Sequence, residues 1–497
     1  MTVSYNEIPS DIHVPLFWAE IDNSKANTTS DGTAPALLLG YANSDAAIIR
    51  NGLTIMPSAG LAGSMAGRGS QLARMVNRYR NVDPTGELWV IALDEPLAGV
   101  AATGTITVVG SAQESGTVYL YIGAEQVQAG VTADDTASDV ATTIAAAINA
   151  NTDLPVTATI AAGVVTLTAR HKGLCGNDIP VTINYCGIVG GETTPNGLTI
   201  TIVAMSGGTG APTLTNAIAA MGDDPFDFIG TPFNDMASVN TIHTEIASRW
   251  GYSRQLYGHA YSAKIDALST LVAYGDSLNL PHVTMPGYEP ATQTAADELV
   301  AMRTARNAIF IRNDPARPTQ TGVLTGALPA PKGSRFMFTE QQSLLSHGIA
   351  TAYVESGSLL IQRDITMYQT NSYGVSDNSF YDSETLHTSA YVMRQLKSVI
   401  TSKYPRHKLA NDGTRFGAGQ AIVTPAVIKG ELLAVYRRLE RAGIVENYDL
   451  FKKYLVVERS ADDPDRLDVL FPPDYINQLR VFAVVNQFRL QYDDSEA

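Results

Sequence analysis

The sequence has very little cysteine, little charge and no long apolar run. Its 497 residues contain two cysteines, Cys175 and Cys186, which excludes a disulfide framework and favours a reducing compartment. No apolar stretch approaches the roughly 20 residues that a membrane-spanning helix needs. The opening MTVSYNEIPSDIHVPLFW lacks a basic segment followed by an apolar run, so we expect no signal peptide. We therefore expect an intracellular, soluble protein of several domains.

The charge is acidic overall and unevenly distributed. The net charge is −15, which argues against sequence-independent nucleic-acid binding, because that binding depends on neutralising phosphates. Residues 391–497 hold 16 of the 34 Lys and Arg residues and 14 of the 49 Asp and Glu residues, a local charge of +2. The remaining 390 residues therefore carry −17. This asymmetry indicates that the two ends meet different partners, and the alternative is a solvated C-terminal surface.

The glycine-rich stretch AGLAGSMAGRGSQLARMVNRYR is the strongest candidate for a phosphate site. It lacks the Lys of a P-loop, which neutralises the phosphates, and it lacks the G-x-G-x-x-G of a dinucleotide site. A helix is expected from Ser70, and several arginines are positioned to hold an anion near its N-terminus. They are Arg68, Arg74, Arg78 and Arg80. We favour the alternative, a glycine loop followed by a helix with a solvated face.

The same stretch contains GSMAG, which faintly resembles a subtilisin-type nucleophile segment with Ser64 as the nucleophile. In that class the chain order is Asp, His, Ser. Only His13 precedes Ser64 here, and a serine without a nearby general base has ordinary reactivity. We therefore expect no catalysis by Ser64.

No pattern of metal ligands occurs. The eight histidines are scattered, and H-E-x-x-H is absent. Cys175 and Cys186 are expected to be small buried hydrophobic residues and not ligands. The acidic run SADDPDRLD at 460–468 lacks the glycine and distal Glu of a calcium loop, so we expect a solvated turn.

The order of apolar runs predicts an α/β core that is interrupted by a β-rich insertion. Strands alternating with helices indicate a parallel sheet covered on both faces. The expected strands are 36–42, 87–95, 227–233, 255–261 and 282–286. Between Gly99 and Gly210 the only basic residues are Arg170 and Lys172, and short Thr/Val-rich runs alternate with turn residues, so this part reads as a β-rich insertion with one helix.

Two helices and several short strands are expected in the C-terminal region. The first helix covers about 383–403 and ends before Pro405. The second covers about 425–442, with Thr424 as its N-cap, Pro425 at the first helical position and Gly443 just beyond the end. The runs YLVV and RLDVLF follow. With the helices they predict a small α+β domain.

The last predicted strand, residues 479–492, raises the question of its partner. Its apolar residues occupy successive even positions, broken at Asn486, and an unpaired apolar edge invites pairing with another chain. The run VPLFWAEID at 14–22 is a second strand candidate, restricted to an edge by Pro15.

Three segments together resemble contractile-tail sheath proteins of the Mu-like phage type. They are IPSDIHVPLFWAEIDNSKA with ALLLGYA near the start, LLSHGIATAYVESGSLLIQRDITMYQTN at 344–371, and SFYDSETLHTSAYVMRQLKSVI. The second departs from the family pattern at Met367, where a second Thr is usual. The segments occur in order over most of the chain.

The resemblance implies a fold and a division into parts. The fold is an α/β core of subtilisin-like topology without catalytic residues, with an inserted β-rich domain and a small α+β C-terminal domain. The parts are an N-terminal arm at 1–30, the core at 31–98 plus 211–380, an outward-pointing insertion at 99–210, a tube-facing C-terminal domain at 381–475, and a C-terminal arm at 476–497.

The resemblance also implies a function. The chain would be a structural subunit, not an enzyme and without a cofactor, that polymerises helically around a tail tube and contracts to drive the tube through the host envelope. Its partners would be other copies in a stack of rings, the tail tube protein, and baseplate and tail terminator proteins, without direct contact to nucleic acid or membrane. It would lie in the virion tail after assembly in the host bacterial cytoplasm.

Three alternatives remain open at this point. The first is the sheath of a non-phage contractile injection system or bacteriocin, which sequence does not separate from a phage tail. The second is a subtilisin-like hydrolase, and the third is a β-rich binding protein with 99–210 as the adhesive module.

Two sets of residues are the candidates for assembly contacts. Strands from both ends are expected to pair with other copies. The residues expected to make this inter-subunit strand pairing are Val14, Leu16, Phe17, Trp18, Ile21, Val481, Phe482, Val484, Phe488 and Leu490. The helix at 425–442 carries the candidate tube-facing residues Lys429, Arg437, Arg438 and Arg441.

Overall fold

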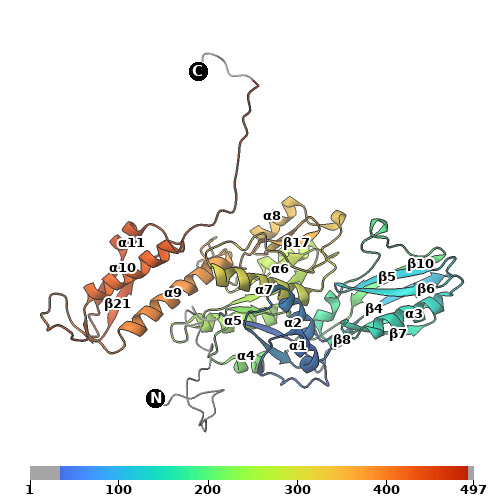
Figure 1. Cartoon of the computed structure of the whole chain (residues 1–497), viewed down its shortest axis with the longest axis horizontal. Helices are drawn as coiled ribbons and strands as arrows, with labels where there is room; N and C mark the ends of the chain where they lie inside the picture. Colours follow the sequence, from blue (N-terminus) through green and yellow to red (C-terminus); the bar gives the residue numbers. More distant parts are fainter. Residues whose placement is uncertain (1–33, 491–497) are drawn as a thin grey trace, which may run out of the picture.

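The computed structural model describes residues 34–490. Figure 1 shows three parts in a row: a β-rich part at one end, an α/β part in the middle and a mainly helical part at the other end. A C-terminal segment leaves the body and runs away from it. Among the helices of residues 34–490, none combines the length and apolar character that crossing a membrane requires.

A six-stranded sheet forms the centre of the α/β part. Its order is β14-β12-β11-β1-β3-β2, and all neighbours are parallel except β2, which is antiparallel to β3. The strands are β1 (Ala36–Tyr41), β2 (Leu53–Ile55), β3 (Leu88–Leu93), β11 (Phe228–Gly230), β12 (His259–Tyr261) and β14 (Val283–Thr284). β1 is buried over its whole length, as expected for a strand covered on both faces. The prediction of a covered parallel sheet is confirmed.

Helices cover both faces of this sheet (Figure 1). One face packs against α1 (Ala59–Ala66), α2 (Gln71–Val82) and α7 (Ala296–Asn313). The other packs against α4 (Thr215–Met221), α5 (Met236–Trp250), α6 (Leu268–Asp276) and α8 (Phe338–Ser346). Gly230 allows α7 to approach closely, because a Cβ there would lie 2.9 Å from Thr304 Oγ1 on that helix.

The expected glycine loop before Ser70 is wrong in part. Residues 59–66 form α1, whose first turn is capped by the Ser58 hydroxyl accepting from the Leu61 N–H. The true turn is confined to Gly67 and Gly69, both at positive φ. A side-chain cap and packing of Ala62 and Ala66 into the core therefore outweigh the helix penalty of two glycines, about 1 kcal/mol each.

The β-rich part is inserted between β3 and α4. A four-stranded antiparallel sheet, β10-β4-β8-β7, and a three-stranded one, β6-β5-β9, share one apolar core with α3. The elements are β4 (Ala101–Gly110), β5 (Gly116–Ile122), β6 (Glu125–Val131), α3 (Ala137–Ala150), β7 (Val156–Ala161), β8 (Val164–Lys172), β9 (Val181–Ile183) and β10 (Leu198–Ser206), with short 3-10 turns at Leu174–Asp178 and Ile188–Gly190. Thr136 and Asp139 form a capping box at the start of α3.

Short pairs of strands complete the middle part. β13 (Lys264–Ile265) runs parallel to β15 (Gly287–Tyr288). β16 (Thr351–Glu355) and β17 (Ser358–Arg363) form a hairpin. A 3-10 turn at Lys332–Ser334 precedes α8.

The helical part is built on α9 (Ser383–Lys403), α10 (Pro425–Arg441) and α11 (Tyr448–Tyr454). Both predicted helices are confirmed with their ends, since the Thr424 hydroxyl accepts from the Val427 N–H and Gly443 has φ +73°. Two strand pairs accompany them: β18 (Lys408–Leu409) with β19 (Ile422–Val423), and β20 (Val456–Arg459) with β21 (Leu467–Leu470). α9 links two parts, because His387 near its start contacts Phe228 of the central sheet while Val399 near its end packs in the C-terminal core.

Candidate functional site

The C-terminal arm is the largest exposed apolar feature that the structure describes. Residues 481–490 pair with no other strand in residues 34–490, and Figure 1 shows them running away from the body. The exposed fraction is 82% for Phe482 and 96% for Leu490. Val481, Val484 and Phe488 are exposed as well. The expected strand therefore finds no partner within its own described chain.

The root of the arm, residues 476–480, is held firmly against the body. The Ile476 N–H donates to the Ile444 carbonyl, and the Gln478 side-chain amide donates to the Ala316 carbonyl at 3.0 Å. These contacts tie the root to the C-terminal domain on one side and to the loop after α7 on the other.

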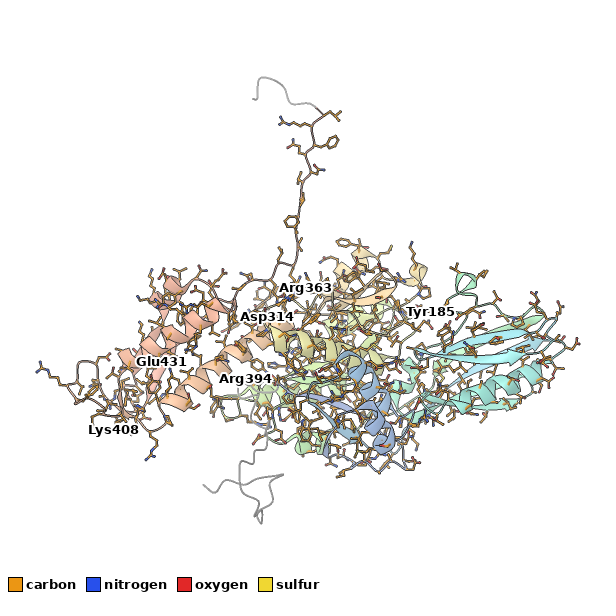
Figure 2. The ribbon with its side chains drawn as sticks, viewed as in Figure 1. Tyr185, Asp314, Arg363, Arg394, Lys408 and Glu431 are labelled. Carbon is orange, nitrogen blue, oxygen red and sulfur yellow. The ribbon has the colours of Figure 1, made fainter. Side chains whose placement is uncertain are left out.

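Arg480 is the last anchored residue before the exposed part of the arm. Its Nη2 lies 3.0 Å from Glu384 Oε1 and 3.4 Å from Asp382 Oδ1, and its side chain is only 10% exposed. Asp382 is also bound bidentately by Arg363 at 2.9 Å. Figure 2 shows Arg363 close to the place where the arm leaves the body.

Glu384 is a fully buried carboxylate in the first turn of α9. It accepts hydrogen bonds from the Thr319 N–H and hydroxyl at 2.9 and 2.8 Å. The same hydroxyl oxygen lies 3.1 Å from Asp364 Oδ2, and Asp364 forms a fully buried ion pair with Arg303 at 2.6 Å. Burial raises the pKa of Glu384, and the Arg480 guanidinium partly offsets that rise. No sequence pattern indicates this network, although Arg480 is the one charged residue between Asp474 and Arg489.

The β20–β21 hairpin offers free strand edges. It is an isolated two-stranded sheet within the described chain, and such a pair is marginally stable without additional strands or packing. Val456, Val469 and Leu470 leave apolar surface exposed on it. Both edges can therefore accept a further strand.

The four basic candidates on α10 do not share one environment. The Lys429 ammonium donates to the Leu455 carbonyl at 2.8 Å, so it fastens α10 to the end of α11. Arg437, Arg438 and Arg441 are exposed and line a shallow surface hollow with Tyr448, over whose ring Arg437 lies at 4.5 Å. Of the ion pairs within residues 34–490, none involves these three arginines.

Ser64 has no catalytic partner in residues 34–490. Its hydroxyl donates to the Leu61 carbonyl at 2.9 Å, and no histidine of the described chain hydrogen-bonds to it. His171 instead uses both ring nitrogens in structural contacts, with Nδ1 2.7 Å from Glu95 Oε1 and Nε2 accepting from the Gln71 N–H. Burial lowers the pKa of His171, although Glu95 acts in the opposite direction.

Arg74 and Arg78 neither bind an anion near the surface nor lie on a solvated helix face, so the favoured expectation is wrong for them. Arg74 pairs with Asp297 and Glu298, and Arg78 pairs with Glu298 and Glu125. These ion pairs join α2 to α7 and to the insertion. Arg68 remains exposed and pairs with Asp153 of the insertion.

The cysteines differ from each other. Cys175 is partly buried against the core, close to the expectation of a buried residue. Cys186 is exposed because it lies in a surface turn, so the same expectation is wrong for it. No cluster of His, Cys, Asp and Glu within residues 34–490 is arranged to hold a metal ion. Residues 460–466 of the acidic run form the connection of the β20–β21 hairpin, largely exposed as predicted, whereas residues 467 and 468 begin β21. The N-terminal candidates Val14, Leu16, Phe17, Trp18 and Ile21 lie outside the described residues.

Three family models match successive parts of the chain. They are the phage tail sheath protein beta-sandwich domain at residues 98–199, the phage tail sheath protein central domain at 207–367, and the phage tail sheath C-terminal domain at 375–489. The Mu-like prophage FluMu tail sheath protein of Haemophilus influenzae is 38% identical over 495 residues, which cover 99% of this chain and 100% of that protein.

Solved structures of sheath proteins are also similar. The sheath tail protein of Listeria innocua gives a TM-score of 0.49 at 13% identity, with 89% of this chain and 92% of that one covered. The sheath tail protein of Desulfitobacterium hafniense gives 0.46 at 13% identity, with 93% and 100% covered. The contracted helical sheath of the anti-feeding prophage gives 0.47 at 9% identity, with 97% and 100% covered.

Proposed function

The chain belongs to the phage tail sheath protein family, and from this premise we propose that it builds its sheath by donating the C-terminal arm to a neighbouring copy. As a member of a family of structural subunits it is not an enzyme. The observation that carries the proposal is the exposed apolar arm, which has no strand partner in its own described chain.

The arm has the chemistry of a donated strand. Residues 481–490 belong to no sheet of residues 34–490, and their apolar side chains alternate over two faces. At about 3.3 Å per residue, residues 481–490 reach about 33 Å from Arg480.

The β20–β21 hairpin is the acceptor that we propose. It has two free edges and exposed apolar residues, so an added strand would turn a marginal pair into a larger sheet. The segment at 14–22, which lies outside the described residues, is the second strand that we propose is donated. Donor and acceptor surfaces differ, and such heterologous contacts build open helical assemblies when they do not close.

The remaining assignments follow the same proposal. The core, of subtilisin-like topology, would be formed by residues 31–98 and 211–380. The outward insertion would be 99–210, the tube-facing domain 381–475 and the arm 476–497. The insertion of an entire β-rich part between β3 and α4, away from the helical part, supports this arrangement (Figure 1). The exposed Arg437, Arg438 and Arg441 would face an acidic tail tube, because exposed ion pairs of about 0–1 kcal/mol each are weak enough to break when subunits move.

Contraction would use energy stored at assembly. The extended lattice would be metastable behind a kinetic barrier, and the baseplate would release it. Strands that stay paired at the ends of extended arms would keep the subunits connected while core surfaces exchange partners. Assembly would take place in the host cytoplasm, with a tail terminator protein limiting the lattice.

Truncation after Val481 tests the donated strand while keeping Arg480. We expect a folded protein that stays monomeric by sedimentation and forms no tubes in negative-stain microscopy. Within the full chain, Phe488→Ser should raise the concentration needed for assembly about tenfold or more, because a buried Phe contributes about 1.5–3 kcal/mol. Gln487→Ser is the matched control on the polar face. Tubes of normal length from the truncated chain would refute the proposal.

A further inference from the structure

The arm supplies the countercharge of a buried carboxylate in the body. Glu384 is fully buried, and Arg480 is the cation that reaches it, at 3.0 Å. The other arginines of the network are committed elsewhere, since Arg363 binds Asp382 and Arg303 binds Asp364. The charge of Glu384 is therefore balanced from the arm.

The surroundings of Glu384 make this contact important. Asp364 and Asp382 are like charges that face the same site, and both raise the pKa of Glu384. Thr319 and the N-terminal end of α9 favour its ionised form, but hydrogen bonds alone rarely compensate for a buried charge. Removing the guanidinium would leave three carboxylates with two cations, and two of those carboxylates, Glu384 and Asp364, are fully buried.

We propose that Arg480 is the positioning residue of the C-terminal arm, which fixes the point where the arm leaves the body and sets its pivot at Val481. The inference rests on the proposed function of the arm. Residues 476–480 then move with the body, and only the residues that follow cross to a neighbour. A pull on the arm is delivered to the first turn of α9, the helix that connects the central sheet to the C-terminal core.

The experiment compares Arg480→Gln with Arg466→Gln, a matched loss of one exposed arginine. Hydrogen exchange on the full-length monomer should be about tenfold faster at residues 475–480 in Arg480→Gln and unchanged there in Arg466→Gln. Tubes of Arg480→Gln should lose uniform pitch and length. Arg480→Lys, which keeps the charge, should restore most of both properties.

A pH profile separates positioning from general stability. Without Arg480 the folded-state pKa of Glu384 rises further above its unfolded value, so the variant loses stability as pH rises and the deficit against wild type is larger at pH 8 than at pH 5. If Arg480→Gln fails to fold, the double variant Glu384→Gln/Arg480→Gln replaces it, because it removes the buried charge together with its cation. We expect the double variant to fold and to show fast hydrogen exchange at residues 475–480.

The outcomes distinguish the two proposals. Uniform wild-type tubes from Arg480→Gln, with unchanged exchange at 475–480, would overturn the anchoring role of Arg480. Tubes from the chain truncated after Val481 would instead overturn the donated strand on which the role depends. Fast exchange at the root together with irregular tubes, in a protein whose Tm is unchanged at pH 5, would support both.

Discussion

Arg303 and Asp364 form an ion pair from which water is excluded on all sides, with Nε and Oδ1 2.6 Å apart and both side chains fully buried. Arg303 lies on α7 and Asp364 follows β17, so the pair joins the helix layer to the strand that precedes α9. The Tyr288 hydroxyl accepts from Arg303, which also donates to the Thr351 carbonyl. The pair thus holds together the segments on which the arm root rests.

Asp364→Asn should destabilise the folded chain strongly. It removes the charge that balances Arg303, and breaking one partner of a buried pair costs about 3–5 kcal/mol. The measurement is the free energy of unfolding from urea titration, with Asp468→Asn in the exposed Arg466–Asp468 pair as the control, where about 0–1 kcal/mol is expected. A loss below about 1 kcal/mol in Asp364→Asn would contradict the role assigned to the pair.

Acid should destabilise the core through four neighbouring histidines, of which His259 and His387 are buried and His243 and His282 are half-buried. His243 stacks on His282, which stacks on Trp250, while His259 contacts His387. Burial lowers the pKa of His282 to about 4 and of His387 to about 3, with Arg394 acting in the same direction on His387. Arg394 is itself paired with Asp227 at 2.6 Å.

The sign of the pH effect follows from the depressed pKa values. Below about pH 6.5 the unfolded chain takes up protons that the folded cluster does not, so each such histidine removes up to about 1.4 kcal/mol of stability per pH unit. The Tm should therefore fall from pH 7 to pH 5. His282→Phe keeps the ring stacking without titration and should reduce that fall, whereas the exposed His407→Gln should not. An unchanged pH dependence in His282→Phe would count against the cluster.

Local signals in the sequence were sufficient to predict the positions of most helices. The ends of α10 are marked by Thr424 as the N-cap, Pro425 with its fixed φ, and Gly443 in the left-handed conformation. Each of these signals depends on a single residue and its neighbours in sequence, so it can be recognised locally. Asp382 occupies the N-cap position of α9, but its side chain makes no cap hydrogen bond and pairs with Arg363 instead. Helix α1 was not predicted because its glycines are typical of a loop. The sequence signal for its start is weak and consists of Ser58, which caps the helix.

The candidate site depends on contacts that the sequence does not display. Arg78 and its partner Glu298 are 220 residues apart, and Arg480 and Glu384 are 96 apart. Pairings over such separations are decided by how whole helices and strands pack together. From sequence alone, a charged residue at either position is therefore predicted to be exposed to solvent. The apolar pattern of the arm was visible, whereas the buried acid that anchors its root was not.

The exposed arginines of α10 yield the last prediction, which concerns how a sheath subunit binds the tail tube. Replacing Arg437, Arg438 and Arg441 together by Gln should leave the fold intact, because all three side chains are exposed and none of the three forms an ion pair within residues 34–490. We expect the triple variant to co-sediment with the tube less than the wild type does. Wild-type binding should weaken as well when salt rises from 50 to 500 mM, because salt screens interactions between exposed charges beyond about 10 Å at 0.1 M. Lys429→Gln is the informative contrast: its ammonium binds the Leu455 carbonyl, so its loss should lower the Tm with little change in the salt dependence. Tube binding that is indifferent both to salt and to the triple substitution would rule this surface out.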